Sequence, residues 1–245
     1  MNLDEFKEAR TRGREELLNK IIEVFGRLKP IAIYQFGSGA TTYKDEFSDL
    51  DIWFAFADEK IESVVKNQNN VFKKIAPVLV KHQSKSWSPP GGSATLIIHK
   101  TKFGLFQIDY YISKSSNTVI KPQAKLLYGK DVFRRGEWIL DKDAKESNTL
   151  RRDVSLLLSL IFIGIKGVLR RWKGPEFDNT IKLVHKRLRN SYSQKIKGRR
   201  IKLSFKLIYR LLADLHFLSN KSQERAIDEI SQYAKVVESL YANKF

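Results

Sequence analysis

The sequence predicts an α+β fold in which a small mixed β-sheet module is followed by a helical bundle. Before residue 145, short apolar runs typical of buried strands alternate with segments of helical periodicity. After that point the periodicity is helical throughout. The charge also changes, because residues 1–150 hold 24 Lys+Arg and 19 Asp+Glu whereas residues 151–245 hold 21 and 8. We therefore predict two domains, residues 1–145 and residues 146–245.

In the first part, the spacing of apolar residues and the positions of proline and glycine predict the helices and strands. Apolar residues from Leu17 to Leu28 recur at helical spacing, and Pro30 ends that helix. A second helix is predicted over residues 59–79, disturbed near its end by Pro77. Strands are predicted over 31–36, 50–56, 94–99 and 105–112, of which the last two form a hairpin. In the second part we predict helices over about 150–172, 179–192, 201–218 and 222–242.

The composition excludes several classes of protein. Hydrophobic residues make up 42% of the chain, which is too apolar for an intrinsically disordered protein. The absence of cysteine excludes a disulfide scaffold, an iron–sulfur protein, a cysteine nucleophile and a cysteine-built zinc site. Residues 1–14 lack the apolar core of a signal peptide, and the most apolar run, residues 154–165, is shorter than the ~20 residues of a membrane helix. We expect a cytoplasmic protein without a membrane partner.

Two carboxylates stand at the start of a predicted strand that is otherwise apolar. Asp49 and Asp51 are two residues apart, so an extended backbone directs both side chains to the same face. Like charges this close repel each other unless a cation neutralises them, and hard oxygen ligands suit Mg²⁺. Asp109 lies within another apolar and aromatic strand. If the two strands pair side by side, three carboxylates converge, which is enough to hold two metal ions for in-line phosphoryl chemistry.

A glycine-rich turn follows the first predicted strand. Gly37-Ser38-Gly39 precedes a predicted short helix. Glycine allows the backbone to approach a phosphate closely, and the serine hydroxyl can donate a hydrogen bond to a phosphate oxygen. By itself each of these features has an ordinary structural explanation, such as a helix N-cap or a strand-end carboxylate. Those explanations do not predict the spacing, the apolar flanks or the third carboxylate.

Together these residues resemble the defining motif of the polymerase-β-type nucleotidyltransferase superfamily. That motif is an apolar residue, Gly-Ser, a spacer of about ten residues, and then Asp-apolar-Asp-apolar. Here Gly37-Ser38 is followed, after ten residues, by Asp49-Leu50-Asp51-Ile52. Asp109 matches the third carboxylate of the superfamily. The helical second part, and residues 124–131 before it, resemble the antibiotic nucleotidyltransferases of the aminoglycoside and lincosamide type.

The resemblance implies a reaction and a role for each residue. The reaction is transfer of a nucleoside monophosphate from a nucleoside triphosphate, with ATP expected first, to a hydroxyl group. Asp49 and Asp51 would ligate two Mg²⁺ ions, and Asp109 would complete the site nearer the acceptor and accept the proton of the attacking hydroxyl. Gly37 and Ser38 would hold the β- and γ-phosphates. Many small relatives carry an arginine three residues after the serine.

This chain departs from the superfamily pattern at that arginine. Position 41 is Thr41, and the next basic residue is Lys44, which becomes the candidate phosphate ligand of this loop.

The acceptor is left open by the sequence. Residues 166–210 contain 15 Lys+Arg and only two acids. This is either a solvated basic face or a track for a nucleic-acid backbone, whose candidate residues are Lys182, Lys186, Arg189, Arg199 and Arg200. The alternatives are an antibiotic-like small molecule, an RNA such as transfer RNA, and a non-catalytic nucleotide- or RNA-binding relative. The positive charge disfavours polycationic aminoglycosides and favours RNA.

Overall fold

The computed structural model describes residues 1–41, 45–141, 144–145, 150–170 and 204–242. The chain divides into two compact units, Met1–Ser147 and Asn148–Phe245, and each is considered by itself. Lys44, the predicted helix 179–192 and the basic residues from Lys182 to Arg200 lie outside the described residues.

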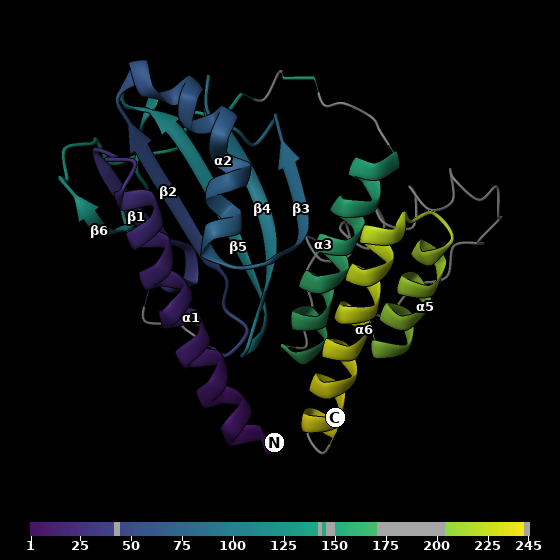
Figure 1. Cartoon of the computed structure of the whole chain (residues 1–245). Helices are drawn as coiled ribbons and strands as arrows, with labels where there is room; N and C mark the ends of the chain where they lie inside the picture. Colours follow the sequence, from purple (N-terminus) through teal and green to yellow (C-terminus); the bar gives the residue numbers. More distant parts are fainter. Residues whose placement is uncertain (42–44, 142–143, 146–149, 171–203, 243–245) are drawn as a thin grey trace. The chain divides into compact units, whose positions relative to one another are not determined.

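The first unit contains a six-stranded mixed sheet, which confirms the mixed character predicted from the sequence (Figure 1). Its order is β3-β4-β5-β2-β1-β6. β2 and β5 are parallel, whereas the other neighbouring pairs are antiparallel. The strands are β1 (Ala32–Phe36), β2 (Leu50–Phe56), β3 (Val78–Ser84), β4 (Ser93–Thr101), β5 (Gly104–Lys114) and β6 (Lys125–Gly129).

Two strands of this sheet were not predicted. The helix expected over residues 59–79 is shorter, α2 (Ile61–Ile75), and its predicted end belongs instead to β3. The reason is Pro77, which cannot continue a helix, followed by the β-branched residues Val78 and Val80. β6 pairs with the outer edge of β1. β6 is short and contains a lysine, so the alternation of apolar and polar residues along it is too weak to predict a strand.

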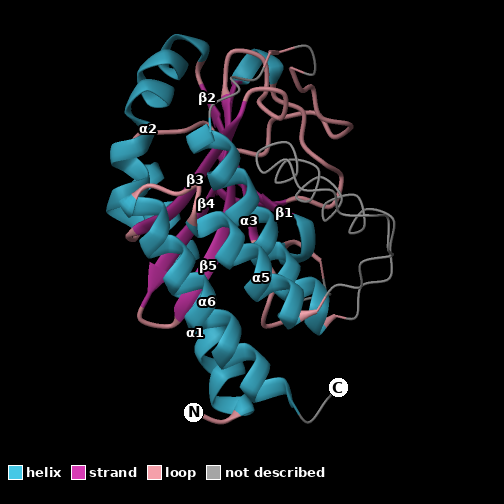
Figure 2. Ribbon diagram, turned by 90° about the vertical axis from the view of Figure 1, so that its right-hand side faces the viewer, coloured by secondary structure: helices cyan, strands magenta, loops and turns pink. Residues whose placement is uncertain are grey.

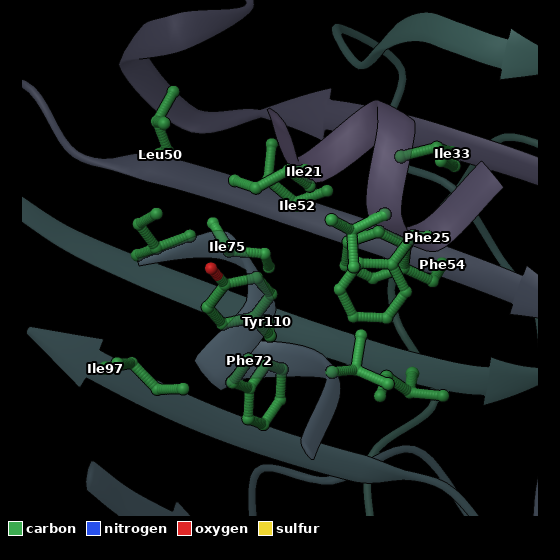
Figure 3. Packing of buried hydrophobic residues seen from close by; sticks show 14 of the residues in the cluster. Ile21, Phe25, Ile33, Leu50, Ile52, Phe54, Phe72, Ile75, Ile97 and Tyr110 are labelled. Atoms are coloured by element: carbon green, nitrogen blue, oxygen red, sulfur yellow. The ribbon is translucent and has the colours of Figure 1, made fainter. Parts of the chain in front are cut away.

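Two helices cover one face of the sheet. The first, α1 (Leu3–Gly26), begins earlier than the apolar periodicity indicated, because Asn2 and Glu5 form a capping box at its N-terminus. The apolar stripes of α1 and α2 pack against β2, β4 and β5 in one buried cluster (Figure 3). At its centre the rings of Phe25 and Phe54 stack at 3.8 Å.

Strand alternation then determines what the opposite face carries. Leu50, Ile52 and Phe54 of β2 lie in the cluster beneath the helices, so Asp51 and Trp53 face away from it. The same alternation in β5 buries Ile108 and Tyr110 under the helices and leaves Asp109 and Tyr111 on the far face. The site residues therefore occupy the face that α1 and α2 do not cover.

The described part of the second unit consists of three helices, α3 (Leu150–Leu169), α5 (Phe205–His216) and α6 (Lys221–Tyr241) (Figure 2). They contact one another pairwise. Ser204 and Asn220 cap α5 and α6, and the Tyr209 hydroxyl donates a 2.7 Å hydrogen bond to Glu238. Within the residues described, no helix has the length and apolarity that a membrane crossing requires.

Candidate functional site

The site is built on a register between two parallel strands. Asp51 of β2 and Asp109 of β5 are direct neighbours across the ladder. Adjacent strands are about 4.8 Å apart, and side chains in register point to the same side of the sheet. Both residues are half-buried on the face opposite α1 and α2. The structure thus brings together two of the three predicted carboxylates, from positions 58 residues apart in the sequence.

The two carboxylates are held in an unfavourable electrostatic environment. Burial raises the pKa of Asp51, and the neighbouring charge of Asp109 raises it further. Burial also raises the pKa of Asp109. Two groups oppose these effects: the charge of Lys121 favours ionised Asp51, and Gln107 Nε2 donates a 3.3 Å hydrogen bond to Asp109. An added cation would relieve the repulsion directly.

Asp49 lies immediately before β2. The turn that precedes it is fixed by α1, because Arg14 donates a 2.9 Å hydrogen bond to the Asp45 carbonyl and Arg10 donates one of 3.1 Å to the Glu46 carbonyl. Across the described ranges, no three acidic or histidine side chains are near enough to one another to hold a metal ion. The convergence of all three carboxylates remains a prediction.

The predicted glycine turn contacts the carboxylate pair. Residues 37–39 form a short 3₁₀ turn, η1 (Gly37–Gly39), directly after β1. This differs from the expectation of a turn followed by a helix. Gly37 has φ +66°, and a Cβ there would collide with Asp51 Oδ2. Glycine is thus required both by the backbone conformation and by the closeness of the carboxylate.

We expect Gly37→Ala to lower the free energy of unfolding by about 2 kcal/mol, because the positive φ is strained for alanine and the new methyl group displaces Asp51. Chemical denaturation measures the change. Gly26→Ala is the control, since a Cβ at that helical position meets Tyr128 at an ordinary 3.6 Å. Equal stability of Gly37→Ala and the native chain would contradict the described turn.

An aromatic cluster adjoins the acid pair on the same face. Trp138 lies 4.4 Å from Phe36, 5.0 Å from Trp53 and 5.0 Å from Tyr111, measured between ring centroids. Burial and the charges of Asp109 and Asp51 raise the pKa of Tyr111, so its phenol stays protonated. Trp53 is buried in this cluster, and Tyr111 is partly buried.

A strap formed by residues 130–141 carries Trp138 across the sheet. It begins beyond β6, where the Lys130 amide donates to the Ile31 carbonyl, and it ends where the Asp141 amide donates a 2.8 Å hydrogen bond to the Ser88 carbonyl. Lys121 Nζ lies 4.4 Å from the centre of the Trp138 ring. Lys121 therefore supplies a positive charge beside Asp51 that is held by a cation–π contact.

Sequence reasoning missed Lys121 and Trp138. Both lie outside predicted strands and helices, in a stretch with several other basic residues. The available signal was the tryptophan at position 138, since a large aromatic side chain in a segment without predicted helix or strand indicates a tertiary contact. Lys44, Lys182, Lys186, Arg189, Arg199 and Arg200 are not among the described residues, so their predicted roles stay predictions.

Comparison with known proteins gives no match, either to a protein-family model or to a curated protein.

Proposed function

We propose that the chain is an Mg²⁺-dependent nucleotidyltransferase that transfers a nucleoside monophosphate from a nucleoside triphosphate, ATP first among them, to a hydroxyl group of a small molecule. The observation that carries the proposal is the register of Asp51 beside Asp109, with the Gly37 turn against Asp51. In this proposal residues 1–145 form the nucleotidyltransferase domain, and residues 146–245 form a basic helical bundle.

The donor set fits a magnesium ion. Asp51 and Asp109 supply carboxylate oxygens, the ligands Mg²⁺ prefers, and Asp49 would add a third carboxylate. Burial and mutual repulsion make the paired ionised state costly without a cation. When bound, the metal would neutralise negative charge on the carboxylates and on the triphosphate.

The proposed reaction is an in-line displacement at phosphorus. The acceptor hydroxyl oxygen forms a bond to the α-phosphorus, the bond from that phosphorus to its bridging oxygen breaks, and pyrophosphate leaves. The hydroxyl proton would pass to the Asp109 carboxylate, which accepts it as a general base. Gly37 and Ser38 lie on the Asp51 side, where the triphosphate would be held.

A second candidate acceptor is RNA, such as transfer RNA. The observation that favours it is the charge of residues 151–245, which hold 21 Lys+Arg against 8 Asp+Glu. A single assay separates the two acceptors. The chain is incubated with Mg²⁺ and each α-³²P-labelled nucleoside triphosphate, then with aminoglycosides, lincosamides or total transfer RNA. Label in a small molecule supports the main proposal, and label in RNA supports the second. Absence of metal-dependent triphosphate binding contradicts both.

We expect Lys121→Met to weaken triphosphate binding about tenfold, because it removes a positive charge beside Asp51. Isothermal titration calorimetry with a non-hydrolysable ATP analogue and Mg²⁺ measures the affinity.

Lys125→Met is the matched control. It removes the same charge from an exposed position on β6. If the two variants lose affinity equally, the affinity depends on the net charge of the protein, and Lys121 has no specific role.

A further inference from the structure

The acid pair lies close to one end of the pairing between β2 and β5. The parallel ladder begins with Leu50 beside Ile108, and Asp51 beside Asp109 is its second residue pair. Because the two strands are parallel, no hairpin turn joins their starting ends. The ends of a ladder open more readily than its middle. The ladder alone therefore gives the two carboxylates a weakly supported spacing.

Ionisation of both acids acts against this end of the ladder. Burial, and after it the neighbouring charge of Asp109, raises the pKa of Asp51. Two like charges on adjacent strands push those strands apart, whereas a bound cation attracts both carboxylates. A cation site here therefore needs a support that holds the starts of both strands at a fixed spacing before the cation binds.

Arg10 of α1 joins the two chain segments that lead into these strands. Its Nε donates a 3.1 Å hydrogen bond to the carbonyl of Glu46, which precedes β2. Its Nη1 donates a hydrogen bond to the carbonyl of Leu105, which precedes the first residue pair of the ladder in β5. A guanidinium presents its donors in a rigid planar fork, so it holds two acceptors at a set separation. One side chain thus connects the starts of both strands.

The surroundings of Arg10 hold its guanidinium in place. The side chain is 2% exposed, and its Cζ lies 3.6 Å from the centre of the Phe106 ring in a cation–π contact. Gly13, one turn further along α1, allows the helix to approach β5 this closely. A Cβ at Gly13 would lie 2.6 Å from Phe106 Cζ, which is nearer than side-chain atoms pack. The guanidinium is therefore confined, as a rigid support requires.

Arg14 allows a comparison within the same helix. It lies one turn after Arg10 and donates a 2.9 Å hydrogen bond to the Asp45 carbonyl, in the turn before β2. Within the part of the chain that the structure describes, Arg14 makes no hydrogen bond to β5. Loss of Arg14 would loosen the turn before β2, whereas loss of Arg10 would also disconnect that turn from β5.

We propose that Arg10 is a positioning residue of the acid pair: it bridges the starts of β2 and β5 and so sets the spacing of Asp51 and Asp109 for a divalent cation. The cation rests on the proposed function, whereas the bridge between the strands does not. Arg10 contacts neither metal nor substrate in this proposal. It acts through the main chain of both strands.

Amide hydrogen exchange, followed by NMR in the full chain without metal, tests the bridge. We expect Arg10→Met to speed exchange about tenfold at residues 50–52 and 108–110, near the bridged end of the ladder. Residues 54–56 and 112–114, at the other end, should keep their native rates. A variant that only destabilised the fold would raise the rates at both ends together.

Two further variants complete the comparison. Arg12→Met is the matched control, because it removes the same charge from the same helix at a side chain that is 62% exposed. Arg10→Lys keeps the charge and the buried stem, so it serves if Arg10→Met fails to fold. An ammonium cannot hold two carbonyls as the fork does, so faster exchange at the bridged end should persist in Arg10→Lys.

Metal binding tests the consequence for the acid pair without catalysis. The probe is Mn²⁺, which takes the same oxygen ligands as Mg²⁺ and whose free ion is measured by electron paramagnetic resonance. We expect Arg10→Met to weaken Mn²⁺ binding about tenfold, as other supports of metal ligands do when removed. Arg12→Met should leave the affinity within about a factor of two. Arg14→Met should cause a smaller loss than Arg10→Met.

The failure of this inference differs from the failure of the proposed function. If the native chain binds Mn²⁺ and the Arg10 variants bind it equally well, or if their exchange rises equally at both ends of the ladder, the inference is overturned and the proposed function stands. If the native chain binds neither Mn²⁺ nor a non-hydrolysable ATP analogue, the proposed function has failed, and the role of Arg10 toward a cation fails with it.

Discussion

Asp51→Asn is expected to reduce nucleotidyl transfer at least a thousandfold while raising the free energy of unfolding. The loss of transfer follows because the amide cannot neutralise a cation at the site, and about 4 kcal/mol of transition-state stabilisation corresponds to three factors of ten. The gain in stability follows because asparagine has nearly the same shape but no ionisable group, so the cost that burial and Asp109 impose on an ionised Asp51 disappears. Label transfer from α-³²P-ATP and urea denaturation measure the two effects.

Asp58→Asn is the matched control for that variant. Asp58 is exposed and accepts hydrogen bonds from Ser115 and Ser116, which lower its pKa to about 2. Its conversion to asparagine should keep transfer and slightly lower stability, the reverse of both effects at Asp51. If Asp51→Asn retains transfer, the carboxylate pair is not the reaction centre. If it loses transfer and stability together, the defect is one of folding.

The second large effect concerns pH and metal. In a protein treated with chelator, the contribution of Asp51 and Asp109 to stability should fall as the pH rises above about 4, where the carboxylates of the unfolded chain lose their protons. The sign follows from the raised pKa values of Asp51 and Asp109, since the folded state then holds protons that the unfolded state has released. Each unit of pKa elevation costs about 1.4 kcal/mol at high pH. Mg²⁺ should restore the stability.

Asp51→Asn isolates this contribution. Burial lowers the pKa of His99 to about 4, so His99 stabilises the fold above its unfolded pKa of about 6.5 and loses that contribution as the pH falls. That effect has the opposite sign but is the same in both proteins. The difference in melting temperature between the native chain and the variant should therefore grow with pH and shrink when Mg²⁺ is added. A difference that is independent of pH and of Mg²⁺ would contradict the buried acid pair.

Much of the fold was predictable because single strands and helices reveal themselves locally. The strand over residues 50–56 was predicted with its observed bounds, and the hairpin between β4 and β5 was predicted with errors of one or two residues. The prediction of a helix over residues 59–79 was wrong at the end of that range, where β3 begins. β3 is a strand because it pairs with β4. The local pattern of residues 78–84 does not identify that partner, so it could not predict the strand.

The amino-acid sequence by itself determined which residue types are available to the site: three carboxylates in or next to apolar strands, a glycine turn at a characteristic spacing, and no cysteine. Only the tertiary structure decided which of them meet. The parallel pairing of β2 with β5 places Asp51 beside Asp109, the positive φ of Gly37 brings its turn against Asp51, and the strap brings Trp138 with Lys121 to the same face. The physical reason is that strand alternation specifies the face of a side chain, whereas its neighbour depends on register and on connections between distant segments.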